Sequence, residues 1–498
     1  MASATREASS ILYQNTECDI ILIDIPSSIA ASQGRTDVLL STAPLEAPIE
    51  PREDYRPKKT TEAQGSVNTT HHAEYKALAE HALSHIQAHV SGPWCAPRQI
   101  AGLQRGKETV SAPRGAPDLP AVAPRHSSPG RFSPVARGGG IAMPEKPLVE
   151  NEELMETDDQ EKELEFRMRE WAAWSERKGD DTAFNLQQMM SSLGAATSAT
   201  EPAAGPQKWT MSYQPAREST SSTQAAETVP QVGQTKQPWM STFHNPHHYS
   251  LSLTLTQNIL QPTQPGQEYR FTIPPRSTLF LSDSTASETF RASFRELTDE
   301  YTLPRHFDLV LLDPPWPNRS AKRKGAYEQV GGMPYLKKML LSMDIDSYLE
   351  HNALVGVWIT NKAALRDHVL GPGGLFETWN VGLVEEWIWI KTTTKGEPMF
   401  DMDSEMRKPY EILLLGRAAP NAWTTMAHAP SVRRRVVAAV PDIHSRKPCL
   451  KPLLEPYLRS PAGYSALEVF ARYLVSGWTA WGNEAFKFNW DGYWAPAL

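Results

Sequence analysis

The carboxyl-terminal half of the chain alternates short apolar runs with stretches whose apolar residues recur every three or four positions. The short runs are typical of buried strands, and the wider spacing is typical of amphipathic helices. The predicted strands are 277–282, 307–312, 353–360, 383–391, 411–416, 435–439 and 467–471, and the predicted helices are 334–350, 362–370 and 450–458. This order predicts an α/β domain over residues 240–498, with helices on both faces of a sheet and ligands at the strand carboxyl ends.

The amino-terminal half has a different pattern. Residues 19–26 form one apolar run that ends at Pro26, and because one strand cannot fold alone, the segment 1–35 is expected to pair with the later domain. Residues 36–235 are rich in Ser, Thr, Ala, Gln, Pro and Gly, a composition that predicts a mostly disordered linker or insertion. Helical islands are predicted at 71–90 and 148–178. The second island suits either a binding partner or packing on its own domain.

Three histidines on the first island, His81, His85 and His89, lie four residues apart, a spacing that can bind a metal ion. Because no carboxylate or thiolate accompanies them, a polar helix face is the favoured interpretation, and no structural metal is expected. Cysteine usage agrees with this. The three cysteines are far apart in the sequence and form no CxxC pair, which excludes a zinc ribbon and a disulfide framework.

Composition limits how the protein can bind its partners. The 498 residues carry a net charge of -7, so nucleic-acid binding is expected to depend on local basic patches rather than on overall charge. The chain begins without an apolar signal core and has no apolar stretch as long as a membrane span, so a soluble intracellular protein without membrane contact is expected. Arg56-Pro57-Lys58-Lys59 is either a weak nuclear signal or solvated surface.

The sequence Asp313-Pro314-Pro315-Trp316 directly follows the predicted strand 307–312. Asp313 offers a carboxylate acceptor, and the two prolines fix the backbone so that carbonyl oxygens can be aimed at a ligand. Trp316 offers a flat face on which an unstacked base can lie. Such a loop can accept the protons of a purine amino group and make its nitrogen a better nucleophile. The alternative is a proline-rich turn with Trp316 in the core.

The last fifty residues carry groups suited to a second ligand. Residues 467–472 read Leu-Glu-Val-Phe-Ala-Arg, and they bring an acid, an aromatic ring and a base into one turn. A carboxylate there can bind ribose hydroxyls and an aromatic ring can flank an adenine. Asn483 and Glu484 follow, and His444-Ser445-Arg446-Lys447-Pro448 offers cations for a carboxylate. Each signal is weak alone.

Together, DPPW at 313–316, VWITN at 357–361, KPYE at 408–411, HSRKP at 444–448 and LEVFAR with GWTAWGNE at 467–484 resemble the MT-A70 family of adenine-N6 methyltransferases. The resemblance covers residues 240–498 and implies a Rossmann-like domain that uses S-adenosyl-L-methionine, with the catalytic motif before the donor-binding segment. It implies catalytic roles for Asp313, Pro314, Pro315 and Trp316. The implied donor-binding residues are Asp283, Lys447, Glu468, Phe470, Arg472, Asn483 and Glu484.

The substrate of such an enzyme is the remaining question. Beyond the motif, Asn318, Arg319, Lys322, Arg323 and Lys324 are expected to meet nucleic-acid phosphates, unless they form a solvated loop; residues 433–435 can extend this path. The resemblance favours RNA, with 2′-O-methyladenosine in small nuclear RNA as the first expectation, and DNA second. The other alternative is a catalytically silent RNA-binding partner, against which the intact Asp313 argues. The protein is expected in the nucleus, with the cytoplasm as the alternative, and a monomer is the expected state.

Overall fold

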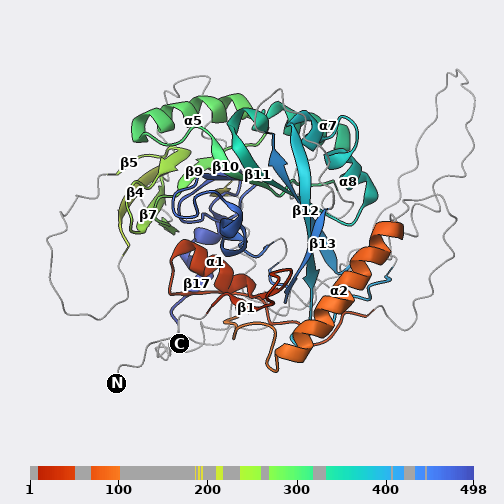
Figure 1. Cartoon of the computed structure of the whole chain (residues 1–498). Helices are drawn as coiled ribbons and strands as arrows, with labels where there is room; N and C mark the ends of the chain where they lie inside the picture. The colour runs from red at the N-terminus through yellow and green to blue at the C-terminus, as the bar shows by residue number, and fades with distance from the viewer. Residues whose placement is uncertain are drawn as a thin grey trace, which may run out of the picture.

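A computed structural model describes residues 9–50, 69–100, 186, 189–190, 192–193, 209–216, 236–258, 268–317, 332–404, 408–419, 432–443 and 446–497. An eleven-stranded mixed sheet forms its centre (Figure 1). From edge to edge the strands are β1 (Ile11–Gln14), β2 (Ile20–Ile23), β14 (Arg433–Ala439), β12 (Val381–Lys391), β13 (Tyr410–Ala418), β11 (Leu349–Ile359), β10 (Phe307–Leu312), β15 (Ala466–Val469), β16 (Trp478–Gly482), β9 (Thr278–Leu281) and β6 (Thr242–His244). The predicted strands of the carboxyl-terminal half all belong to this sheet.

One edge of this sheet collects the ends of its parallel strands. Strands β11, β10, β15, β16 and β9 run parallel to one another, so their carboxyl ends meet there. Strand β13 runs antiparallel to its neighbours β11 and β12, and it therefore begins at this edge, which we call the carboxyl edge. The register pairs Leu312 with Val469, so Asp313 and Phe470 emerge side by side.

Helices cover both faces of the sheet and create two hydrophobic cores (Figure 1). The first core is covered by α2 (Thr69–His89), α5 (Ser287–Tyr301), α7 (Gly332–Ser342), α8 (Ala363–Leu370) and α9 (Leu375–Thr378), and the second by α1 (Ile25–Gln33) and α10 (Lys451–Leu454). Short 3₁₀ turns are η2 (Ile345–Tyr348), η3 (Glu455–Tyr457), η4 (Lys487–Asn489) and η5 (Asp491–Tyr493). The predicted layered, Rossmann-like α/β arrangement is confirmed.

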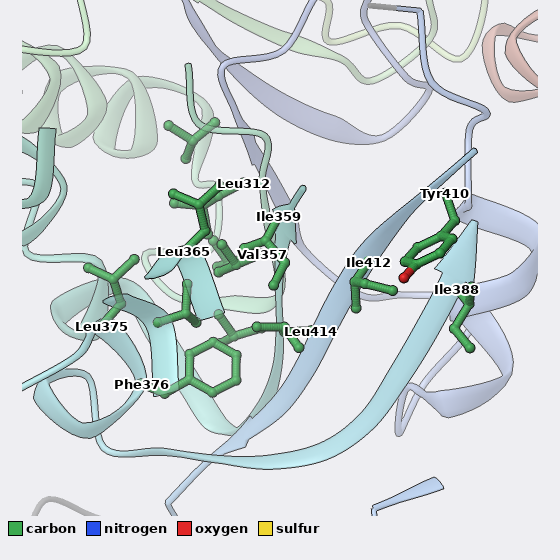
Figure 2. Close-up of a cluster of buried hydrophobic side chains, with 14 of the residues drawn as sticks. Leu312, Val357, Ile359, Leu365, Leu375, Phe376, Ile388, Tyr410, Ile412 and Leu414 are labelled. Carbon is green, nitrogen blue, oxygen red and sulfur yellow. The ribbon is translucent and has the colours of Figure 1, made fainter. Parts of the chain in front are cut away.

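The two cores follow from the alternation of side chains along each strand. Leu312, Ile359 and Ile412 face the first core, where Figure 2 shows them with Leu365 of α8. Their strand neighbours, such as Trp358, face the second core. Successive residues at the carboxyl edge therefore project to opposite faces of the sheet, and two separate surfaces can be built from the same strand ends.

Segments from the amino-terminal half are part of this domain. The strand expected at 19–26 is β2, which pairs in parallel with β14 through Ile20 and Val436. The helix expected at 71–90 is α2, which buries Tyr75, Ala79 and Ile86 in the first core. The second expected helix, at 148–178, lies outside the described residues, and the division of the chain at residues 35 and 240 stays a prediction.

The histidines of α2 contact β1 rather than a cluster of metal ligands. The Tyr13 hydroxyl lies 3.1 Å from Nδ1 of His85, and the rings of His85 and His89 stack with centroids 4.5 Å apart. Within the described ranges, no group of three or more histidine, cysteine or acidic side chains is placed to hold a metal ion. These contacts are those of a polar helix face, which is the interpretation that the sequence favoured for His81, His85 and His89.

A second, four-stranded sheet was not predicted. Its order is β5 (Gln237–Pro238), β4 (Trp209–Pro215), β7 (Leu251–Gln257) and β8 (Glu268–Ile273), and its buried leucines form a third core with residues that follow β15 and β16. Two further short strands, β3 (Val38–Leu39) and β17 (Trp494–Ala495), pair with each other. Across the part of the chain that is described, no helix has the length and apolar character needed to cross a bilayer.

Candidate active site

The loop Asp313-Pro314-Pro315-Trp316 leaves β10 at the carboxyl edge, between β11 and β15. The Asp313 backbone N–H donates to the Val469 carbonyl at 3.4 Å, and Trp316 N–H donates to the Pro314 carbonyl at 2.8 Å. On the other side, Trp316 Nε1 donates to the Trp358 carbonyl at 2.6 Å. The Trp316 ring is half-buried against the first core. Both neighbouring strands therefore fix this loop, and the Asp313 carboxylate is left to interact with other side chains.

Asp313 begins a chain of alternating charges along the carboxyl edge. Its Oδ1 lies 3.3 Å from Lys447 Nζ, which also donates to Glu411 Oε2 at 2.7 Å. The other oxygen of Glu411 accepts from Lys391 Nζ at 2.6 Å. The Lys447 ammonium lies 5.0 Å from the ring centre of Trp358, close enough for a cation–π interaction. The chain fixes Lys447 beside Asp313.

The charge states of this chain are set by its own members. Burial acts to lower the pKa of Lys447, but the carboxylates of Asp313 and Glu411 outweigh it and raise the pKa above its ordinary value. Burial likewise acts to raise the pKa of Glu411, but Lys391 and Lys447 outweigh it and hold that pKa far below its usual range. Lys447 is therefore a cation and Glu411 an anion at neutral pH.

A cavity opens beside this chain on the second face of the sheet. It encloses about 480 Å³, including its open mouth, and we call it the Asp313 pocket. Its lining residues are Leu311, Asp313, Trp358, Lys447, Pro448, Cys449, Leu450, Glu468, Phe470, Arg472, Tyr473 and Trp478. Four of the predicted donor-binding residues, Lys447, Glu468, Phe470 and Arg472, thus share one cavity with Asp313.

Glu468 is the acidic group on the far wall of the Asp313 pocket. It belongs to β15 and is half-buried. Burial, followed by the charge of Asp313, raises the pKa of Glu468 to about 8. At pH 7 this side chain is therefore mostly protonated, and it can both donate and accept hydrogen bonds.

The turn after β15 brings Phe470 into the Asp313 pocket through an uncommon backbone conformation. Phe470 has φ of 64°, in the left-handed region that bulky residues rarely adopt. Its N–H donates to the Trp481 carbonyl at 2.7 Å. Gly482 has φ of 158°, and a Cβ there would lie 3.2 Å from the Phe470 backbone. A side chain at position 482 would therefore press on the turn that presents Phe470, and such strained turns cluster at functional sites.

Glu484 extends the Asp313 pocket outward through Arg472. Its Oε2 lies 3.7 Å from Arg472 Nε, and its Oε1 accepts from Lys487 Nζ at 2.7 Å. Burial acts to raise the pKa of Glu484, but Lys487 and Arg472 outweigh it and lower that pKa. Asn483 and Asp283 are exposed residues that follow the paired strands β16 and β9, outside the pocket lining. Asp283 accepts a hydrogen bond from Thr285 N–H at 2.8 Å.

The remaining predicted contacts divide into two groups. Asn318, Arg319, Lys322, Arg323, Lys324, His444 and Ser445 lie outside the described residues. The proposed phosphate path through residues 433–435 is wrong for two of its members. Arg435 binds Glu385 at 2.7 Å, and Arg434 binds Glu386 at 2.9 Å. These arginines belong to the start of β14, away from the carboxyl edge, and they neutralise acids in the sheet.

Sequence reasoning missed several residues of the site. Lys391 and Glu411 carry half of the charge chain, while Trp358 and Tyr473 line the Asp313 pocket. The positions of Lys391 and Glu411 in the sequence could have indicated that they belong to the site. Each stands at the end of an apolar run, Lys391 closing residues 387–390 and Glu411 opening residues 412–415. A charge at a strand end on the ligand-binding edge is a candidate site residue.

The parallel-centred sheet, the Asp-Pro-Pro-Trp loop and the pocket at the carboxyl edge together define the class of protein, which is a Rossmann-like α/β domain with its ligand site at the strand ends. Residues 307–484 match the family model described as MT-A70. This match confirms the resemblance that the sequence motifs predicted. The match begins at β10 and ends at Glu484, so it includes every residue that lines the Asp313 pocket.

Three relatives are similar to part of the chain. It is 40% identical over 224 residues to the N6-methyladenosine RNA methyltransferase MTA1 of Cryphonectria parasitica, covering 45% of this chain and 62% of that protein. It is 33% identical over 230 residues to the human N(6)-adenine-specific methyltransferase METTL4, covering 45% and 44%. It is 32% identical over 219 residues to a DNA N6-methyl methyltransferase of Caenorhabditis elegans, covering 44% and 53%. The matched region spans less than two thirds of each relative.

Proposed function

We propose that the protein is a methyltransferase that transfers a methyl group from S-adenosyl-L-methionine to N6 of adenine in nucleic acid. The observation that carries this proposal is the Asp313 pocket. One cavity joins the carboxylate of the Asp-Pro-Pro-Trp loop to the acid, the aromatic ring and the two cations that a nucleoside-containing amino acid requires. The match of residues 307–484 to the MT-A70 family model supports it, as do the names of the relatives.

The lining of the Asp313 pocket fits the chemistry of the methyl donor. The Lys447 ammonium has three N–H donors, of which Asp313 and Glu411 account for two, so it can also bind the donor carboxylate. Glu468 can hydrogen-bond the ribose hydroxyls, and Phe470 can pack against the adenine ring. Asn483 and Glu484, just beyond the lining, are assigned to the outer part of the donor, and Asp283 lies on the neighbouring strand end.

The loop performs the chemistry through acceptance of protons and through positioning. The donor supplies an electrophilic methyl group on a sulfonium sulfur. Asp313 and the Pro314 carbonyl accept hydrogen bonds from the adenine amino group, which directs its lone pair toward that methyl. With the donor bound, the amine nitrogen would take the methyl group as its bond to sulfur breaks, and Asp313 or water would accept the proton that the amine loses. Holding the two reactants in line supplies much of the rate acceleration.

RNA is the proposed substrate, with 2′-O-methyladenosine of small nuclear RNA as the finer hypothesis. The name of the Cryphonectria parasitica relative, an RNA methyltransferase, supports RNA. DNA is the second candidate, because the Caenorhabditis elegans relative is named as a DNA methyltransferase. The intact Asp313 disfavours a silent RNA-binding partner. We further propose that the protein acts as a monomer in the nucleus, where the basic run at 56–59 would serve as an import signal.

A methylation assay on matched oligonucleotides tests the proposal. One adenine is placed in the same sequence as ribo-, 2′-O-methylribo- and deoxyribonucleotide, and the donor carries an isotopic label. Nucleoside mass spectrometry then reads the product. We expect labelled N6-methyladenine, most of it in the 2′-O-methyl RNA. Labelling of the deoxyribonucleotide alone would replace RNA by DNA. Absence of label from all three would overturn the activity.

A further inference from the structure

A second cavity lies at the carboxyl edge on the opposite face of the sheet. It encloses about 350 Å³ with its open mouth, and we call it the α2–α8 pocket. Its lining residues are His71, His72, Tyr75, Ile359, Thr360, Asn361, Lys362, Ala363, Arg366, Tyr410 and Ile412. Ile359, Tyr410 and Ile412 belong to the buried cluster in Figure 2. The pocket therefore has an apolar floor and a polar rim.

The rim of the α2–α8 pocket is suited to an anion. Lys362 is exposed, Arg366 is half-buried, and none of the eleven lining residues is acidic. Helix α8 begins in the pocket at Ala363, and the N-cap residue Lys362 makes no side-chain capping hydrogen bond. The amino end of a helix attracts anions through its backbone N–H groups and its dipole.

A buried hydroxyl gives a second and independent sign of a missing ligand. Thr360 Oγ1 is shielded from solvent and makes no hydrogen bond to the described part of the chain. A buried polar atom without a partner is costly, and native proteins normally supply one. Thr360 lies three residues before Ala363, the first residue of α8, and both line the pocket, so the hydroxyl and the first helix amides can serve the same group.

The wall supplied by α2 and Arg366 is held rigidly. Arg366 pairs with the buried Glu386, and its Nη1 donates to the Tyr75 hydroxyl at 3.1 Å. The His72 ring bridges Tyr410, at 2.7 Å from its hydroxyl, and Lys408, at 3.2 Å. Burial, and then Lys408, lowers the pKa of His72, so this ring is neutral and structural. Lys362, Thr360 and the helix amides are therefore the groups that remain to bind a ligand.

The α2–α8 pocket adjoins the catalytic loop. Trp316 donates to the Trp358 carbonyl, and Thr360 follows two residues later, about 7 Å further along the strand direction. We infer that this pocket binds a phosphodiester group of the substrate strand next to the target adenine. The inference rests on the proposed function, and it gives the helix α2 of the amino-terminal half a place in the wall of the pocket.

A binding cycle tests this inference without requiring activity. Fluorescence anisotropy measures the Kd of a labelled single-stranded RNA that contains one adenine, with wild type and with Lys362→Ala. The same RNA is also made with neutral methylphosphonate linkages, one at a time, on either side of the adenine. Thr360→Val serves as a second variant that keeps the charge. Arg459→Ala is the control, because Arg459 is an exposed cation after η3, on the side of the sheet where β15 begins.

We expect Lys362→Ala to weaken binding about five- to tenfold and to reduce the magnitude of the salt slope by about 0.7. One of the neutral linkages should weaken binding to wild type by the same factor as Lys362→Ala does. The same linkage should not weaken binding to Lys362→Ala any further. Thr360→Val should weaken binding and leave the salt slope unchanged. Two results would overturn the inference. One is a Kd change below twofold for both variants. The other is that, for every linkage tested, the loss of affinity from the neutral linkage and the loss from Lys362→Ala multiply when the two are combined.

Two further arms distinguish a substrate-strand site from a free-anion site and from a failure of the proposed activity. Inorganic phosphate is used as a competitor; if Lys362→Ala abolishes competition by phosphate but leaves RNA binding unchanged, the pocket binds a free anion and the inference fails. The methylation assay on the same RNA separates the two proposals. A positive binding cycle with an inactive enzyme would refute the proposed activity and support the pocket. Normal methylation together with a negative binding cycle would refute the role of the α2–α8 pocket alone and leave the proposed activity in place.

Discussion

Two pockets share the carboxyl edge of one sheet and have opposite electrostatic character. The Asp313 pocket brings acids and bases together, so each group shifts the pKa of another. The α2–α8 pocket presents cations and a helix amino end, and its one nearby buried acid, Glu386, is already neutralised. The difference arises from strand alternation, since Glu411 and Tyr410 are neighbours that project to opposite faces. Mixed charge suits chemistry, whereas a lining with cations and no acids suits the binding of an anion.

The sharpest difference between the pockets should appear on replacement of Asp313. Asp313→Asn removes the carboxylate that accepts the amino proton, and kcat should fall by roughly 10²–10⁴. Donor affinity should change little, because Lys447 and Arg472 remain. Single-turnover methylation and calorimetric donor titration measure the two effects. Asp299→Asn, on the exposed end of α5, is the control and should behave as wild type. Activity within threefold of wild type in Asp313→Asn would remove the catalytic role.

The wall of the α2–α8 pocket should depend on Glu386 for stability. Glu386 is fully buried between Arg366 and Arg434. Burial acts to raise its pKa, but the two arginines outweigh it and lower the pKa, so the carboxylate is charged. Glu386→Ala removes the acid that Arg366 pairs with and leaves Arg434 with Glu74 alone, so the free energy of unfolding should fall by about 3–5 kcal/mol. Urea denaturation measures this. Glu296→Ala, on an exposed face of α5, should stay within about 0.5 kcal/mol of wild type, and an equally small effect at Glu386 would contradict the ion-network account.

Lys447 should matter for donor binding more than for folding. Lys447→Met removes the cation assigned to the donor carboxylate and keeps the aliphatic contact with Trp358. The loss of one charged hydrogen bond of about 1.5–3 kcal/mol corresponds to a donor Kd roughly 10- to 100-fold higher. Calorimetry measures this Kd. Lys338→Met, an exposed lysine on α7, is the control. An unchanged donor Kd in Lys447→Met would mean that the donor carboxylate lies elsewhere.

The smallest effect should be a pH dependence that arises from Glu468. Because its pKa is raised to about 8, the side chain is protonated below that pH and ionised above it. Linkage then predicts that the Glu468 contribution to stability is fully present below the unfolded-state pKa and is lost as the pH rises through 8. Ribose hydroxyls are better donors to the carboxylate form, so the donor Kd should decrease severalfold between pH 7 and pH 9.

Glu468→Gln separates this titration from that of other groups. The variant stays neutral at every pH, so its donor Kd should be flat between pH 7 and pH 9. Its unfolding free energy should lose the same pH-dependent component. If wild type and Glu468→Gln showed the same slope, the titrating group would be a different one, and the contact between Glu468 and the ribose would be in doubt.

The fold could be predicted where one physical signal dominated. Strand 307–312 was predicted with its observed bounds, because both faces of β10 are buried and its sequence is apolar apart from Asp308. Strand β7 was missed because its leucines alternate with Ser and Thr in a polar context, and it has only one buried face. The strand at 478–482 was interpreted only as part of a ligand-binding motif, although Trp481 is fully buried and Trp478 lines the Asp313 pocket.

Site residues could be predicted where they belong to sequence motifs. They could not be predicted where their proximity depends on which strands become neighbours in the sheet. Asp313, Glu468, Phe470 and Arg472 stand out because acids, bases and aromatic rings follow apolar strands. No sequence pattern indicates that Lys391, Glu411 and Lys447, from three separate segments, form one charge chain, since that depends on which strands become neighbours. The α2–α8 pocket was equally hidden, because α2 reaches it from nearly 300 residues away in the sequence.

A structure determined with S-adenosylhomocysteine tests the account most directly, because the position of this ligand shows which of the two pockets binds the methyl donor. We predict density in the Asp313 pocket, with the carboxylate at Lys447, the ribose at Glu468 and the sulfur facing Asp313. Density for this ligand in the α2–α8 pocket, or a sulfur that faces away from Asp313, would contradict the assignment of the catalytic centre.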